Sequence, residues 1–99
     1  MAFQVNWTRR ASSDLAEIDA FIAADRTDAA AREGGNILRQ VDLLATFPPM
    51  GSPYRKTADA EYSSVLSGNY RIVYLIRSTE PVVDIVTIRH GAQNEPEIL

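Results

Sequence analysis

The sequence predicts an α+β fold in which an N-terminal strand is followed by an antiparallel helical hairpin, and this hairpin packs on a mainly antiparallel sheet of about four strands. Three observations predict this fold. The first residues alternate apolar and polar side chains, which is typical of a strand. Two longer segments then repeat apolar residues at the spacing of a helix. The last third of the chain contains two apolar, β-branched runs that flank a turn-like stretch, the pattern of a β-hairpin.

The first predicted elements are a short strand and a helix. Phe3, Val5 and Trp7 alternate with polar residues, and Thr8 has a side chain suited to capping a helix. A helix is therefore expected to begin at Arg9. Its apolar stripe consists of Ala11, Leu15, Ile18 and Ile22.

A second, longer helix is expected after a break in the pattern at residues 24–27. Thr27 or Asp28 can cap it, and it should extend to about Thr46, because the prolines at 48 and 49 cannot continue a helix. Gly34 and Gly35 lie in its interior, where two glycines cost roughly 2 kcal/mol relative to alanine. We interpret them as a place where the two helices pack closely; a kink is the alternative.

The rest of the chain is predicted to supply most of the sheet. Residues 50–60 have a loop-like composition, residues 61–66 a strand-like one, and residues 67–69 should form a tight turn. The hairpin follows, with strands at 70–76 and 82–88. Both faces of its first strand carry apolar residues, so one should pack on the helices and the other should line a groove or be covered by a partner. The two faces are Arg71, Val73, Leu75 and Arg77, and Tyr70, Ile72, Tyr74 and Ile76.

Composition excludes several classes of protein. The 99 residues are treated as a single domain, 1–99, with an ordinary apolar fraction of 45%. With no cysteine and one histidine, the sequence excludes a disulfide framework and a histidine- or thiolate-rich metal centre, and it suggests no cofactor. No apolar run reaches the ~20 residues of a membrane span and no signal peptide is recognisable, so a cytoplasmic location is expected. The net charge of −3 argues against strong, non-specific RNA binding.

Arg71 is the first candidate functional residue. It lies inside a predicted strand, with apolar neighbours on its own face. An unpaired arginine at such a position is costly, so Arg71 needs an anionic partner. That partner is either a carboxylate of the fold, with Asp84 on the neighbouring strand as the candidate, or the phosphate of a target. The sequence leaves both open.

Five short motifs occur in order along the chain: Val5-x-Trp7-Thr8, Ala11-x-x-Asp14-Leu15-x-x-Ile18, Phe47-Pro48-x-x-Gly51, Gly68-x-Tyr70-Arg71-Ile72-x-Tyr74 and Ile88-x-His90-Gly91. Together they resemble the RelE/ParE toxin superfamily over nearly the whole chain. The resemblance implies a small α+β toxin from a type II toxin–antitoxin pair. It also implies a protein partner, a partly disordered antitoxin that folds over the toxin's sheet and helices and holds it inactive.

The resemblance implies one of two targets. RelE-like members enter the ribosome and cleave messenger RNA without metal, by attack of a 2′-hydroxyl on the adjacent phosphate. That reaction needs a base, a cation for the phosphorane and an acid for the leaving oxygen. ParE-like members act on DNA gyrase and lack a nuclease constellation.

The resemblance also implies roles for individual residues. Arg71 matches the arginine of the Tyr-Arg motif, which stabilises the phosphate in the nuclease branch. His90 falls where some nuclease members place an acid, and it also matches the His-Gly pattern of ParE-like members. The other expected site residues are Arg55, Lys56 and Arg89 for phosphate or target contact, and Tyr70, Tyr74 and Arg77 for antitoxin contact.

Each of these roles has a structural alternative. We interpret Arg77 and Arg89 first as solvated residues at strand ends, and Tyr70 and Tyr74 as core or antitoxin-facing residues. His90 could cap the sheet or contact the antitoxin instead of acting as an acid.

Departures from the family pattern favour the ParE-like branch. Ser63 and Ser64 stand where members of both branches often have a basic residue, and Gln93 replaces an arginine that often follows the His-Gly pair. Both differences weaken a phosphate-binding interpretation. A third hypothesis is an inactive or purely antitoxin-binding module that autoregulates transcription.

Overall fold

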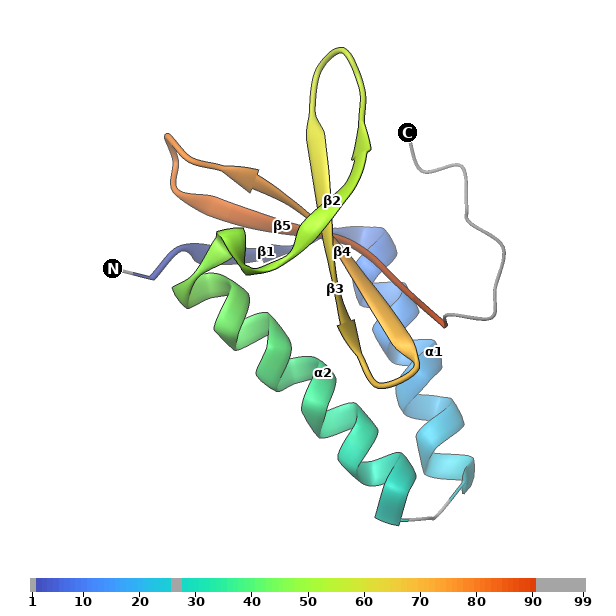
Figure 1. The fold of residues 1–99 in the computed structure, drawn as a ribbon. Helices are drawn as coiled ribbons and strands as arrows, with labels where there is room; N and C mark the ends of the chain where they lie inside the picture. The colour runs from blue at the N-terminus through green and yellow to red at the C-terminus, as the bar shows by residue number, and fades with distance from the viewer. Residues whose placement is uncertain (1, 26–27, 91–99) are drawn as a thin grey trace.

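The structure of the chain is a computed structural model, and it describes residues 2–25 and 28–90. The possible helix cap at Thr27, the His-Gly pair's glycine and Gln93 lie outside the described residues. Five strands form one sheet in the order β1-β5-β4-β3-β2, in which β1 is parallel to β5 and the other pairs are antiparallel (Figure 1). The elements are β1 (Gln4–Trp7), α1 (Arg9–Asp25), α2 (Asp28–Thr46), the 3-10 helix η1 (Pro48–Met50), β2 (Ser52–Lys56), β3 (Glu61–Ser67), β4 (Tyr70–Arg77) and β5 (Val82–His90).

The predicted α+β architecture is confirmed, with one more strand than expected. Strand β2 lies within the stretch whose composition looked loop-like. It occupies the edge of the sheet, where Pro53 is tolerated because a proline lacks the N–H that an inner strand would use. The register between β2 and β3 shifts between Pro53 and Arg55, so the strand is also irregular. A short, polar, irregular edge strand leaves little periodic signal in the sequence.

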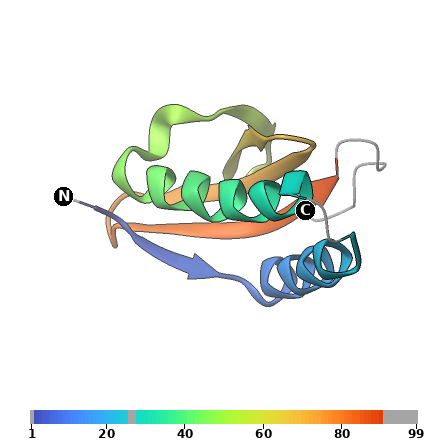
Figure 2. The ribbon, with the colours of Figure 1, turned by 90° about the horizontal axis from the view of Figure 1, so that it is seen from below.

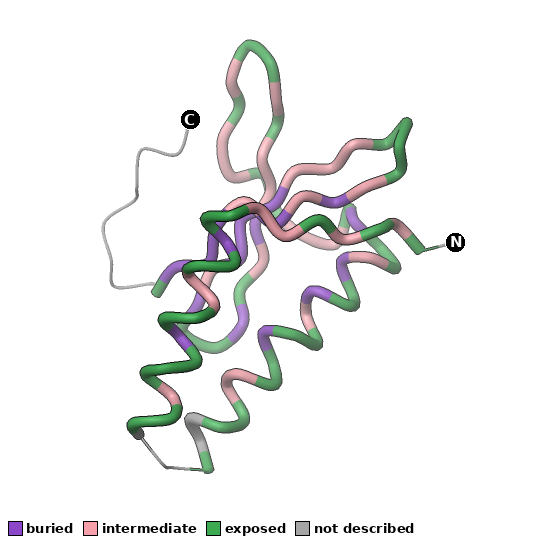
Figure 3. Tube along the Cα trace, turned by 180° about the vertical axis from the view of Figure 1, so that it is seen from behind, coloured by how far each residue is buried: buried purple, intermediate pink, exposed green. Residues whose placement is uncertain are grey.

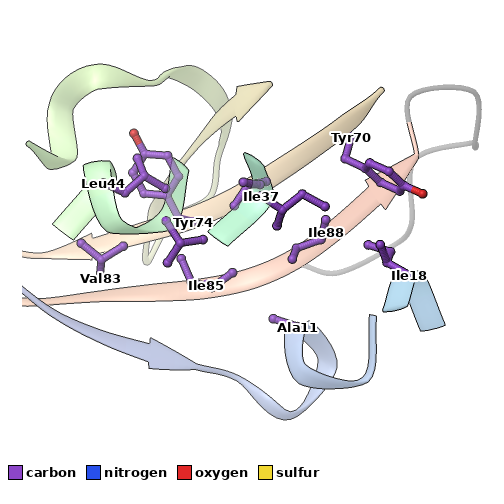
Figure 4. Packing of buried hydrophobic residues seen from close by; sticks show 11 residues of the cluster. Ala11, Ile18, Ile37, Leu44, Tyr70, Tyr74, Val83, Ile85 and Ile88 are labelled. Atoms are coloured by element: carbon purple, nitrogen blue, oxygen red, sulfur yellow. The ribbon is translucent and has the colours of Figure 1, made fainter. Parts of the chain in front are cut away.

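The hydrophobic core lies between the helices and one face of the sheet. Helix α1 contacts β5 and helix α2 contacts β3, and the two helices contact each other (Figure 2). The buried stretches of the chain gather on β4, on β5 and on the helix turns that face them (Figure 3). The expected face of β4 supplies Tyr70, Ile72 and Tyr74 to this core, where they meet residues of the helices and of β5 (Figure 4). No helix in the described part of the chain is long and apolar enough to cross a membrane.

Thr8 caps the first helix as predicted and also ties it to the sheet. Its Oγ1 accepts a hydrogen bond from the backbone N–H of Ala11, at 3.2 Å, and its hydroxyl donates a hydrogen bond to the carbonyl oxygen of Ile85, at 2.7 Å. The cap therefore joins the end of β1 and the start of α1 to the last strand, which is distant in sequence.

Close packing of the helices explains one of the two glycines in α2 but not the other. A Cβ atom built on Gly34 would lie 3.0 Å from Cδ1 of Ile22 on α1, so the close packing expected between the helices is confirmed at this position. A Cβ atom on Gly35 would meet nothing within 4 Å. The helix runs unbroken from Asp28 to Thr46, so the pair does not interrupt it.

Candidate functional site

Arg71 and His90, the two expected catalytic residues, belong to opposite faces of the sheet. In the register of β4 and β5, Tyr70 stands opposite His90 and Arg71 stands opposite Arg89. Because directly opposed residues share a face and successive residues alternate, Arg71 lies on the face away from the helices and His90 on the helix face. The His90 ring accordingly makes an edge contact with the Tyr70 ring, at 5.4 Å between centroids.

The face away from the helices carries a basic cluster, which we call the open-face cluster and define as Arg71, Arg89, Arg55, Tyr54 and Ser64. Arg71 Nη1 donates a hydrogen bond to Ser64 Oγ, at 2.9 Å. The guanidinium groups of Arg71 and Arg55 both approach the Tyr54 ring, at 5.8 and 5.9 Å from its centroid. Strands β2, β3, β4 and β5 each contribute at least one member.

Arg89 corrects an expectation. It was a candidate for a solvated strand end, but only 7% of its surface is exposed, and its Nη1 has no hydrogen-bond partner among the described residues. It stands directly opposite Arg71, and like charges in that position destabilise a sheet. The pair therefore carries a cost that a bound anion would relieve.

Asp84 is not the partner of Arg71. Its carboxylate receives the Arg77 side chain in two contacts, from Nε at 2.8 Å and from Nη2 at 3.0 Å, and it also accepts from Asn6 Nδ2 at 2.7 Å. Arg77 reaches Glu80 as well. The hydrogen bonding of the Arg77 guanidinium to the Asp84 carboxylate is the main cause that raises the pKa of Arg77. Arg77 is thus held at the other end of β4 by a network that joins β1, β4 and β5.

Lys56 lies at the far end of β2 and does not join the open-face cluster through any contact described. Its Nζ is 3.0 Å from a carboxylate oxygen of Glu61, and both side chains are more than two-thirds exposed. An ion pair as exposed as this contributes little to stability. Lys56 therefore remains available at the surface.

Tyr74 is a core residue with both hydrogen-bonding functions in use. Its hydroxyl donates to the carbonyl oxygen of Pro48, at 2.6 Å, and accepts from the backbone N–H of Gly51, at 2.9 Å. Burial raises the pKa of Tyr74. Because Tyr74 has no exposed surface, and only 6% of Tyr70 is exposed, the folded chain leaves the two tyrosines little area with which to contact an antitoxin.

A cleft of about 280 Å³ opens on the helix face beside His90. Asp14 is one of its lining residues, and its Oδ2 accepts hydrogen bonds from the Thr87 hydroxyl and from the backbone N–H of Ile88, the latter at 3.1 Å. The cleft offers His90 carboxylates and apolar walls but no arginine. Its lining is Asp14, Glu17, Ile18, Phe21, Tyr70, Ile88 and His90.

Sequence reasoning missed three residues that shape these sites. Tyr54 and Ser64 contact Arg71. Tyr54 lies in the stretch that was predicted to be a loop, and Ser64 was considered only because it replaces a basic residue of the family pattern. Asp14 was visible as part of a motif, yet its role depends on a register shift between β4 and β5 that no local pattern encodes.

A family model described as the ParE toxin of the type II toxin–antitoxin system, parDE, matches residues 5–95. The chain belongs to the ParE toxin family. A relative from Sinorhizobium fredii, named "Putative toxin Y4kP", is 39% identical over 97 residues, which are 97% of this chain and 96% of that protein. Membership of the ParE family confirms the resemblance on which the sequence interpretation rested.

Solved structures share the fold of this ParE-family chain at low sequence identity. A chain of the toxin–antitoxin complex RelBE2 from Mycobacterium tuberculosis superposes with a TM-score of 0.67 at 24% identity, covering 94% of this chain and 95% of that one. A chain of the ParDE system from P. aeruginosa gives 0.66 at 16% identity, covering 90% and 96%. The RelE–RelB complex from Pyrococcus horikoshii gives 0.66 at 16%, covering 95% and 100%. Both branches of the superfamily therefore share this fold, and the fold alone does not separate them.

Proposed function

We propose that this ParE-family chain inhibits growth by acting on DNA gyrase, without cleaving RNA, and that a cognate antitoxin neutralises it in the cytoplasm. The observation that carries the proposal is the separation of Arg71 and His90 by the sheet. Cleavage of RNA requires a cation and proton-transfer groups within hydrogen-bond reach of one phosphate. The side chains that contact Arg71 are a serine and a tyrosine, with neither imidazole nor carboxylate among those described.

The open-face cluster is the surface that we propose to meet the target. Arg71 is partly exposed, while Arg89 adds its charge from a buried position and Arg55 adds its charge from the edge strand β2. Guanidinium charges in a partly desolvated setting attract an anionic surface strongly. A site of this composition binds an anionic target without supplying chemistry.

Exposed apolar side chains support the proposal that an antitoxin binds this chain. Large apolar side chains stand on the outside of a small protein, and such surface marks a place for a partner. The Mycobacterium tuberculosis structure is a toxin–antitoxin complex and the Pyrococcus horikoshii structure is a RelE–RelB complex, which supports a protein partner here. The exposed residues are Phe21, Leu38, Leu43, Phe47 and Leu66.

The alternative is a RelE-like, ribosome-dependent nuclease, and one observation favours it. Arg71 stands opposite Arg89 and its guanidinium approaches the ring of Tyr54, whose hydroxyl is buried without a hydrogen-bond partner among the described residues. Arginines stabilise a phosphorane, and a tyrosine can exchange a proton. Tyr54 would then have to supply the proton transfer that His90 cannot reach from the helix face.

Inducible expression of the chain alone in bacteria separates these functions. The proposal predicts growth arrest with filamentation, a DNA-damage response and intact messenger RNA. Arg71→Ala should weaken the arrest, and the Arg71→Lys variant, which keeps the charge but not the guanidinium, should fall between. Arg32→Ala, at an exposed position on α2, is the matched control and should arrest growth fully. Thermal unfolding of each purified variant checks that it folds.

Two outcomes of that experiment would overturn the proposal. New messenger RNA ends, lost in Arg71→Ala, would establish the nuclease. Growth that continues unaffected by the folded, expressed chain would establish an inactive or purely antitoxin-binding module.

A further inference from the structure

A groove of about 250 Å³ runs between helix α2 and the end of strand β3. It borders the open-face cluster, because Leu66 in its lining stands opposite Arg71 in the register of β3 and β4. The end of β3 lies next to α2 in the fold (Figure 1). The groove combines an unpaired strand edge, two unused polar atoms, two apolar flanks and one cation. Its lining is Asn36, Arg39, Gln40, Leu43, Leu66, Ser67 and Gly68.

The edge of the sheet is open along this groove. Strand β2 pairs with β3 only as far as Ser64, so residues 65–67 have β4 on one side and no strand on the other in the described chain. Such an edge exposes backbone groups that can pair with another chain. Here the carbonyl oxygen of Leu66 accepts a hydrogen bond from Gln40 Nε2, at 3.1 Å, so a side chain occupies the place of a neighbouring strand.

Two polar atoms in the groove are buried without a partner in the described structure. They are Oε1 of Gln40 and Oγ of Ser67, and Ser67 as a whole is only 4% exposed. A buried polar atom without a hydrogen bond costs free energy. The Gln40 oxygen can accept a hydrogen bond from a peptide N–H. The Ser67 hydroxyl can donate a hydrogen bond to a peptide C=O or accept one from a peptide N–H.

The flanks of the groove are apolar and its charge is positive. Leu43 and Leu66 are 49% and 56% exposed on its two sides. Arg39 is the only charged residue in its lining, and Nη1 of Arg39 donates to the side chain of Asn36 and makes no ion pair within the described chain. The carboxylate of Glu33, close by, is engaged by the backbone N–H of Asn69, at 3.1 Å.

We propose that this groove binds an extended, acidic and apolar segment of the antitoxin alongside the end of β3. An apolar side chain of the segment fills the space between Leu43 and Leu66, a backbone N–H donates to Gln40 Oε1, and a carboxylate pairs with Arg39. Local charge complementarity selects this occupant, because Arg39 is the only charged residue among the described residues that line the groove. The inference rests on the proposed function, which supplies the antitoxin.

Binding of the protein encoded beside this gene, measured by calorimetry with the purified full-length chain, tests the proposal. Leu43→Ser should weaken binding tenfold or more. Ala31→Ser is the matched control, because Ala31 is exposed on the same helix but does not line the groove, and it should change the affinity less than twofold. Arg39→Glu should also weaken binding, by an amount that shrinks at high salt.

Hydrogen exchange of the complex provides a second readout, since it reports on the backbone directly. Amides at residues 65–68 should become protected when the partner binds, even if a groove variant folds poorly. Tight binding that is indifferent to Leu43→Ser and Arg39→Glu, with no protection at residues 65–68, would overturn this inference and leave the proposed antitoxin in place. A neighbour-encoded protein that does not bind the unsubstituted chain would overturn both.

Discussion

Gly51 illustrates how much a single position can constrain this fold. Its φ angle of −81° is ordinary, so conformational freedom does not explain the glycine. Space does: a Cβ atom there would lie 2.3 Å from the Tyr74 hydroxyl and 2.6 Å from the carbonyl oxygen of Ser64. The Phe-Pro-x-x-Gly motif therefore contacts Tyr74 of β4 directly, and this contact holds η1 against the sheet.

Gly51→Ala should consequently lower the free energy of unfolding by about 3 kcal/mol, from overpacking and from loss of the hydrogen bond to Tyr74. Urea unfolding followed by circular dichroism measures it. Tyr74→Phe, which removes the hydroxyl, should restore part of the stability of the Gly51→Ala chain. Additive losses in the double variant would contradict the contact.

The buried tyrosines predict a loss of stability in alkali. Burial raises the pKa of Tyr74 and of Tyr70 above the ordinary value of 10.0, and for Tyr70 the nearby Glu33 carboxylate adds to the effect. The unfolded chain therefore releases these protons at a lower pH than the folded chain. Their contribution is full below pH 10 and is lost as the pH rises beyond it.

Urea unfolding between pH 8 and 11 tests this expectation. The free energy of unfolding should decline above about pH 10, and the decline should be shallower in Tyr70→Phe, which removes one of the two groups. An equally steep decline in that variant would show that Tyr70 does not contribute.

At the scale of elements, Asp14 fastens α1 to the irregular part of β5. It accepts hydrogen bonds from Thr87 and Ile88, where the register with β4 shifts. Asp14→Ala leaves the nearly fully buried Thr87 hydroxyl and a backbone N–H without a partner, and should cost about 3 kcal/mol. Thermal unfolding should show a drop of roughly 15 °C. Asp19→Ala, on an exposed position of the same helix, should change stability by less than about 0.5 kcal/mol.

The glycine pair of α2 supplies a matched test of helix packing. Gly35→Ala should raise the free energy of unfolding by about 1 kcal/mol, because alanine favours the helix and its methyl group meets open space. Gly34→Ala gains the same propensity but presses on Ile22, so its net effect should be smaller. The urea midpoints of the two variants provide the comparison. Equal stabilisation would show that Gly34 is not needed for the helices to approach.

Elements with a periodic pattern were predictable from the sequence, and elements defined by long-range contacts were not. The alternation of Val5 and Trp7, the capping threonine and the apolar stripes each encode a local structure, and each was found in place. Strand β2 exists because β3 pairs with it, and its own polar sequence shows no period. Side-chain partners were unpredictable for the same reason. Asp84 pairs with Arg77 and not with Arg71, because the register of β4 against β5 places Arg77 nearer to it.

At the scale of the whole molecule, the alternation of side chains along β5 places the candidate site residues on two different faces of the sheet. Neighbours in the sequence of β5, Arg89 and His90, point to opposite faces, so the sheet distributes a cation pair to one side and an imidazole to the other. The identities of these residues were visible in the sequence, and so was the face of Arg71. Their grouping required the register of β5 against β4. This division is the central reason for proposing a target-binding toxin over a nuclease.

A gyrase supercoiling assay with the purified chain tests that claim most directly. Relaxed plasmid, gyrase and ATP are incubated with increasing amounts of toxin, with Arg71→Ala and Arg32→Ala run in parallel. We expect supercoiling to be inhibited by the unsubstituted chain and by Arg32→Ala, and much less by Arg71→Ala. Unimpaired supercoiling by gyrase, together with cleavage of messenger RNA when the same preparation is added to translating ribosomes, would contradict the account.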